Sequence, residues 1–112
     1  MQRFGFVGRL KPERVETYVQ LHADPWPGVL ARLHESHVQN YSIFHKPLPS
    51  GEHLVFAYFE YTGDDFDADM RRIGENEETL RWWDVCKPCF DVLEPLPAGE
   101  VWSPMQLIFR ME

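Results

Sequence analysis

The sequence predicts an α+β fold of the ferredoxin-like βαββαβ type, with one antiparallel sheet. Segments in which apolar and polar residues alternate have the period of strands, and segments with apolar residues every three to four positions have roughly the period of helices. Along the chain they follow the order strand, helices, strand, strand, helices, strand, which is the order of this fold. The length of 112 residues is typical of a single domain, which we expect to span residues 1–112.

The first strand, residues 3–10, is followed by two helices whose ends are set by prolines. A helix can begin at Pro12, because proline fits the first helical turn. It should end near Ala23 or Asp24, because a residue that precedes proline is displaced from the α region. A second helix can begin at Pro27, because the first helical position needs no backbone donor.

The middle of the chain predicts an antiparallel hairpin. Residues 53–61 alternate most clearly, and residues 40–45 alternate as well. The polar segment 46–52 between them contains proline, serine and glycine, which is typical of a loop between paired strands. One face of the earlier strand holds three side chains, Tyr41, Ile43 and His45.

The second half of the chain predicts two more helices and a closing strand. Asp65 and Asn76 are residue types that cap helices, and Gly74 between them should end the first of the two. The last strand should begin near Met105, with Leu107, Phe109 and Met111 on one face.

Apolar residues also occupy the sheet face that the helices of this fold leave uncovered. Two copies could bury these faces against each other by packing sheet on sheet. We therefore expect a homodimer, in the form of a dimeric α+β barrel.

The composition excludes several classes of partner. The net charge is −7 and the pI is near 5.1, which argues against nucleic acid and against an anionic membrane surface. No apolar run is long enough to span a membrane, and the N-terminus has no signal-peptide core. We expect a cytoplasmic protein that binds neither nucleic acid nor membrane.

His22 is the first candidate for chemistry. Tyr18 precedes it by four residues, so both side chains project from one face of a helix. His22 lies at the end of that helix, where the helix dipole favours the protonated imidazole. An imidazole that exchanges a proton near neutral pH is suited to acid–base catalysis, although a lone histidine is more often structural.

Trp82 and Trp83 are the second candidate. Adjacent helical residues point about 100° apart, so one indole can enter the core while the other lines a pocket. Indole rings stack on the C–H faces of sugars, but two packing residues are the simpler interpretation.

Cys86 and Cys89 are spaced like a redox or zinc motif. Redox pairs lie where a strand meets a helix N-terminus, whereas this pair comes late in a helical pattern. A structural zinc site needs four ligands, and no second pair is present. Two buried free thiols are therefore expected, with no metal site.

Taken together, these motifs resemble the L-rhamnose mutarotase family. The matching features occur in the same order and at similar spacing over essentially the whole chain. They are an aromatic opening strand with a proline-initiated helix, Tyr18-x-x-x-His22, Trp26-Pro27, Asn40-Tyr41, Trp82-Trp83 and a closing strand with Phe109.

The resemblance implies a dimeric ferredoxin-like barrel and an isomerase that interconverts the α and β anomers of a 6-deoxy-sugar. It makes His22 the proton donor, which we expect to serve the ring oxygen, with Tyr18 orienting the sugar or relaying a proton. Ring opening and closure need neither redox chemistry nor group transfer, so no cofactor is expected. The implied sugar-binding residues are Tyr18, Tyr41, Trp82 and Trp83.

The sequence leaves three alternatives to an L-rhamnose mutarotase. One is an L-fucose mutarotase of the same family. Another is an oxygenase of the dimeric α+β barrel type that acts on aromatic or haem-like substrates, because an apolar pocket with a single histidine would suit it. The last is a sugar-binding or regulatory domain without catalysis, because fold alone does not decide function.

Overall fold

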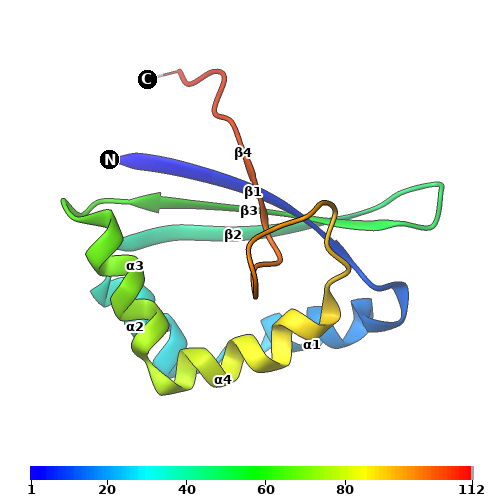
Figure 1. Cartoon of the computed structure of the whole chain (residues 1–112), viewed down its shortest axis with the longest axis horizontal. Helices are drawn as coiled ribbons and strands as arrows, with labels where there is room; N and C mark the ends of the chain where they lie inside the picture. The colour runs from blue at the N-terminus through cyan, green and yellow to red at the C-terminus, as the bar shows by residue number, and fades with distance from the viewer. Residues whose placement is uncertain (112) are drawn as a thin grey trace.

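The computed structural model describes residues 1–111, which form a four-stranded antiparallel sheet with the helices on one face (Figure 1). The strands lie in the order β2-β3-β1-β4, which confirms the predicted fold. No helix in this part of the chain has both the length and the apolar character needed to cross a membrane. The strands are β1 (Gln2–Leu10), β2 (Val38–Pro47), β3 (His53–Tyr61) and β4 (Ser103–Met105). The α-helices are α1 (Val15–Ala23), α2 (Pro27–Glu35), α3 (Phe66–Glu75) and α4 (Glu77–Cys86), with short 3₁₀ turns at Pro12–Arg14 and Lys87–Cys89.

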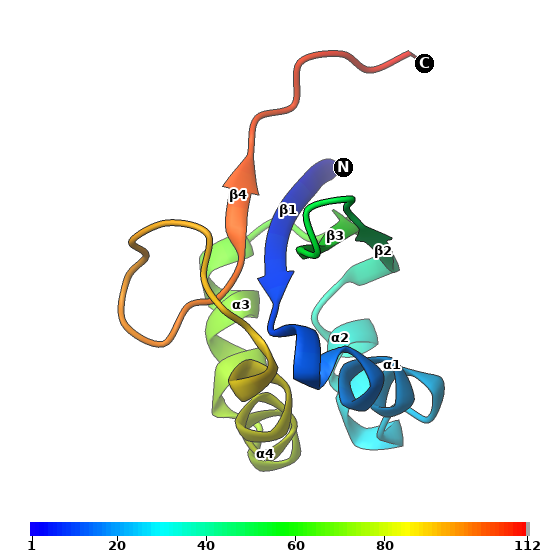
Figure 2. The ribbon, with the colours of Figure 1, turned by 90° about the vertical axis from the view of Figure 1, so that its right-hand side faces the viewer.

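The helices form two pairs under the sheet, α1 with α2 and α3 with α4 (Figure 2). As predicted, α1 ends directly before Asp24 and Pro25, and α2 begins at Pro27. His22 consequently lies in the last turn of α1, where the chain turns toward α2.

The predicted caps begin the second pair of helices. The side chain of Asp65 accepts a hydrogen bond from the amide of Ala68 at 3.2 Å. Asn76 accepts from the amide and the hydroxyl of Thr79, at 2.9 and 2.8 Å. Gly74 was predicted to end α3, but it lies within the last turn of that helix. Asn76, directly after α3, is both its last flanking residue and the cap from which α4 begins.

A bulge in β2 decides which way the Tyr41 side chain points. Gln39 pairs with Glu60 and Ser42 with Tyr58, so Asn40 and Tyr41 together oppose one residue of β3. Asn40 adopts a φ of 52°, a left-handed conformation that asparagine tolerates better than most residues. Such a bulge redirects a side chain, and the ring of Tyr41 stacks at 5.5 Å on Phe59, a buried residue of the helix-facing side.

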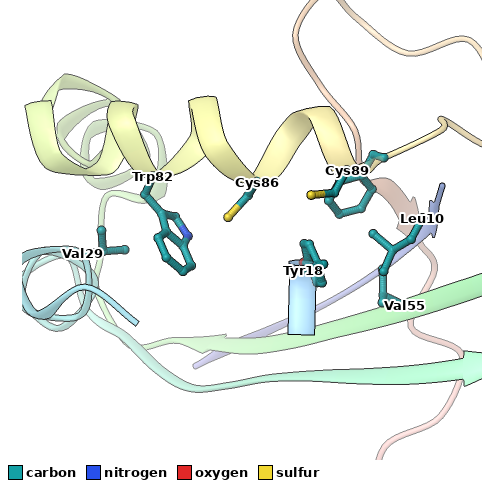
Figure 3. Close-up of a cluster of buried hydrophobic side chains, with 8 residues drawn as sticks. Leu10, Tyr18, Val29, Val55, Trp82, Cys86 and Cys89 are labelled. Carbon is teal, nitrogen blue, oxygen red and sulfur yellow. The ribbon is translucent and has the colours of Figure 1, made fainter. Parts of the chain in front are cut away.

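The core lies between the sheet and α4. Trp82, Cys86 and Cys89 point from α4 and the turn after it toward the sheet, and Tyr18 of α1 lies between them and β3 (Figure 3). On the sheet side, Leu10 and Val55 are each 1% exposed. This cluster fixes Tyr18, and therefore the last turn of α1, against the sheet.

Asp69 ties α3 to the far end of the sheet. Its carboxylate is 2% exposed and accepts hydrogen bonds from the hydroxyl of Tyr61 and from Nδ1 of His37, the latter at 3.1 Å. Arg72 pairs with the same carboxylate. These contacts satisfy a buried charge, which is the condition under which such a group is tolerated.

The closing strand is shorter than predicted and starts earlier. β4 covers Ser103–Met105, and residues 106–111 are not part of a strand. This segment leaves the sheet on the side away from the helices (Figures 1 and 2). Ile108 is 88% exposed and Phe109 76%, so these apolar side chains are largely uncovered within residues 1–111.

Candidate active site

The imidazole of His22 lies between two aromatic rings at the end of α1. Its ring centre is 4.2 Å from that of Tyr18 and 5.2 Å from that of Trp82. Nδ1 lies 2.8 Å from the carbonyl oxygen of Tyr18. Because a carbonyl oxygen only accepts, Nδ1 carries the hydrogen, and Nε2 is the nitrogen that can exchange a proton.

Burial controls the charge of His22. Desolvation lowers the pKa of this imidazole below its ordinary value of 6.5, and the hydrogen bond to the Tyr18 carbonyl opposes the shift only in part. The sequence predicted that the helix dipole would favour the protonated form. That prediction is wrong, because desolvation by burial favours the neutral imidazole. At neutral pH, Nε2 therefore has a free lone pair.

Tyr18 holds His22 in place but does not itself exchange a proton near neutral pH. The residue is 4% exposed, and its ring also contacts Phe90 edge to face at 5.3 Å. Burial raises the pKa of Tyr18 far above its ordinary value, and the nearby phenol of Tyr41 adds to the rise. Tyr18 is consequently a neutral phenol that can donate or accept hydrogen bonds but cannot serve as a base near neutral pH.

A pocket of about 340 Å³ opens beside His22. This volume lies at the lower end of the range of small-molecule sites, roughly 300–1,000 Å³. Its wall is mostly aliphatic, and its polar groups come from a phenol and two imidazoles. The lining residues are Leu10, Tyr18, Val19, His22, Ala23, Ile43, His45 and Val55. Such a wall suits a small ligand that carries both C–H surface and hydroxyl groups.

A second pocket of the same volume lies around Arg9. Its charged groups already satisfy each other, since Arg9 Nη1 pairs with Glu52 Oε2 at 2.9 Å and Arg9 Nη2 donates to the carbonyl of Val92 at 3.1 Å. Its third charged residue, Asp91, lies 3.6 Å from Arg9 Nε, so the pocket holds a surface ion-pair network and no histidine.

Tyr41 lies near Tyr18 on the sheet side but does not line the His22 pocket. The residue is 42% exposed, but its hydroxyl end is desolvated, which raises the pKa of Tyr41 to about 12, with a smaller contribution from the nearby Cys86 thiol. The bulge is held by Glu60, which accepts hydrogen bonds from the side chains of Gln39 and Asn40 at 2.9 and 2.8 Å. The position of the Tyr41 phenol thus depends on this carboxylate.

The two tryptophans diverge as their spacing predicts. Trp82 is 8% exposed and contacts the rings of both His22 and Trp26. Trp83 is partly buried, and the ammonium group of Lys87 lies over its ring at 4.9 Å. Trp82 therefore contacts His22 directly and Trp83 packs against the same core cluster, but neither tryptophan lines the pocket.

The two cysteines are unpaired and buried, as the sequence predicts. Burial raises the pKa of the Cys86 thiol to about 12, with the neighbouring Cys89 as a second cause. Neither thiol has the lowered pKa of a redox centre. Within residues 1–111, no group of three or more potential metal ligands comes together.

His45 is the pocket residue that sequence reasoning missed. The alternation of β2 placed it on the same face as Tyr41 and Ile43, which was a usable indication. Without the position of α1, nothing in the sequence connected that face to His22. In the structure both imidazoles line one pocket.

Comparison with known proteins identifies the family of the chain. A family model described as L-rhamnose mutarotase matches residues 3–111. The chain is 30% identical over 112 residues to the L-rhamnose mutarotase of Lactiplantibacillus plantarum, and 29% identical over 113 residues to that of Bacteroides thetaiotaomicron, with the whole of each chain covered. The crystal structure of L-rhamnose mutarotase from Formosa agariphila superposes with a TM-score of 0.75 at 26% identity, again over the full length of both chains. The chain thus belongs to the L-rhamnose mutarotase family, whose members are isomerases that act on a carbohydrate.

Proposed function

We propose that this protein interconverts the α and β anomers of L-rhamnose, with His22 as the central acid–base residue. The observation that carries the proposal is the hydrogen bond at 2.8 Å from His22 Nδ1 to the Tyr18 carbonyl, at the wall of the pocket. This contact fixes the ring and leaves Nε2 as the nitrogen that exchanges protons. Family membership favours this function over an oxygenase or a sugar-binding domain without catalysis.

Anomer exchange requires opening of the pyranose ring, rotation about the C1–C2 bond and closure. In the proposed opening step, Nε2 of His22 accepts the proton of the anomeric hydroxyl while the C1–O5 bond breaks and O5 takes a proton from a second donor, which regains it on closure. The imidazolium then returns its proton to the C1 oxygen as the ring closes on the other face. Because the pKa of His22 is lowered, accepting comes first, and the proposal replaces the donation to the ring oxygen expected from the sequence by donation to the C1 oxygen on closure.

The remaining candidate residues bind the sugar in this proposal. Tyr18 and Tyr41 remain neutral phenols near pH 7, so they can hydrogen-bond sugar hydroxyls without competing for the exchanged proton. Trp82 and Trp83 offer indole surface to the C–H faces and the C6 methyl group. The aliphatic part of the pocket excludes water while the open chain rotates.

The rate of exchange should fall on acidification. The neutral imidazole of His22 is the active form, so the rate is expected to drop as the pH falls through the lowered pKa of His22, below about 6.5. Saturation-transfer NMR of L-rhamnose between pH 4.5 and 8 measures this dependence. A rate that keeps rising as the pH falls below about 6.5 would contradict the proposed order of proton transfer.

We also propose that the protein is a cytoplasmic homodimer. Two exposed apolar surfaces support the dimer: the open sheet face, where Phe44 is 66% exposed, and the segment 106–111. A second copy could cover both. Unpaired Cys86 and Cys89 suit a reducing compartment. Light scattering after gel filtration should give about twice the chain mass of 13.3 kDa, and a mass equal to one chain would contradict the dimer.

A further inference from the structure

We propose that His45 is the second acid–base group of the anomer exchange, serving the ring oxygen while His22 serves the anomeric hydroxyl, and that His53 positions it. This inference rests on the proposed function, because it assigns a partner to His22 in the same reaction. Opening the ring requires a proton at O5 as well as a base at O1, and His22 provides only one of the two.

The hairpin brings His45 and His53 together beside the pocket. His45 of β2 pairs with Val55 of β3. His53 lies two residues before Val55, on the same face of the sheet. Nε2 of His45 lies 3.0 Å from Nδ1 of His53, and the two rings are nearly parallel at 13° with their centres 5.2 Å apart. This hydrogen bond restricts the orientation of the His45 ring at the wall of the pocket.

The hydrogen bond also decides which nitrogen of His45 can reach a ligand. Nε2 is engaged with His53, so Nδ1 is the nitrogen left for a contact in the pocket. Two neutral imidazoles carry two N–H hydrogens, and the protonated pair carries three. In the protonated pair, one hydrogen is on Nδ1 of His45, one lies between the two rings, and one is on Nε2 of His53. The pair then acts as a single acid.

The proton count of the reaction balances with this assignment. As the C1–O5 bond breaks, Nδ1 of His45 gives its proton to O5 and the pair becomes neutral, while Nε2 of His22 takes the proton of O1 and becomes positive. Ring closure reverses both transfers after rotation about C1–C2. The sum of charges in the pocket stays the same throughout, and no oxidant, reductant or metal takes part.

The other walls of the pocket offer no substitute. Five of the eight lining residues are aliphatic: Leu10, Val19, Ala23, Ile43 and Val55. Tyr18 is the remaining polar residue, and its phenol is buried and holds its proton tightly. Among the residues that line the pocket, His45 is therefore the one group besides His22 whose ring nitrogens can both donate and accept a proton.

The test measures exchange between α- and β-L-rhamnose by saturation-transfer NMR in wild type, His45→Ala and His45→Gln. Removing a general acid typically costs 10²–10⁴-fold in rate, and we expect at least about a tenfold loss in both variants. Sugar affinity, measured by tryptophan fluorescence, should stay within about threefold, because the loss falls on proton transfer. Added imidazole should restore part of the rate to His45→Ala, and His53→Ala should lie between wild type and His45→Ala.

His34→Gln is the matched control, since His34 is an exposed histidine of α2 outside the pocket and should leave the rate unchanged. Circular dichroism verifies that each variant is folded, and His45 is an exposed strand residue whose replacement should be tolerated. If the wild type is active and either His45 variant keeps a rate within about twofold of it, this inference is overturned. The proposed function would still stand in that case. A folded wild type that exchanges neither L-rhamnose nor L-fucose would overturn the proposed function and this inference with it.

Discussion

Replacing His22 by alanine is expected to reduce the catalysed exchange of L-rhamnose anomers by about 10²–10⁴-fold, the usual contribution of a general acid–base residue. The reason is structural as well as chemical. The imidazole is held by the Tyr18 carbonyl at 2.8 Å and by the rings of Tyr18 and Trp82, so its Nε2 is fixed at the pocket wall. Neither phenol nearby can replace it, because burial raises the pKa of both Tyr18 and Tyr41.

The variant should remain folded, because His22 lies at a helix end and is partly exposed. Its circular dichroism spectrum should match that of the wild type, and His34→Ala provides a control for the loss of a histidine elsewhere. If the folded His22→Ala protein exchanged anomers at a near-normal rate, His22 would not be the acid–base residue.

Replacing Trp82 by alanine should destabilise the protein by about 3–5 kcal/mol, the typical cost of removing a large aromatic side chain from a core. The indole is 8% exposed and lies between α4 and the sheet, in contact with His22 and Trp26 (Figure 3). Its removal would leave a cavity beside the site and release the His22 ring. Urea-induced unfolding monitored by circular dichroism measures the free energy of unfolding directly.

A residue on the exposed side of the same helix supplies the control. Leu80 is 42% exposed, so Leu80→Ala should cost well under half as much as Trp82→Ala. Trp82→Phe should recover part of the stability while binding L-rhamnose more weakly, because the smaller ring covers less of the sugar. Equal destabilisation by the Trp82 and Leu80 variants would show that Trp82 does not anchor the site.

Much of the fold was predictable because its determinants are local. Alternation in residues 40–45 and 53–61 gave the correct faces of β2 and β3, and Pro25 and Pro27 gave the end of one helix and the start of the next. The cap at Asn76 was equally evident. These features depend on backbone geometry within a few residues, and no distant contact overrides them.

The predictions that were wrong or incomplete concern features that depend on contacts between residues far apart in the sequence. The protonation preference of His22 was mispredicted because it is set by desolvation on burial, where Trp82 of another helix contacts the ring. The final strand was predicted too long because Leu107, Phe109 and Met111 alternate as in a strand, whereas β4 ends at Met105 and all three side chains are exposed. His45 was overlooked because only the packing of α1 on the hairpin brings it to the pocket.

The most direct test of the proposed activity is saturation transfer on L-rhamnose at anomeric equilibrium, with a catalytic amount of wild-type protein. Irradiating the α anomeric proton should reduce the β signal in proportion to enzyme concentration, and more strongly than the same experiment with L-fucose. If the β signal stayed at its uncatalysed level for both sugars, this chain would share the family's fold without its activity, and the role assigned to His22 would be wrong.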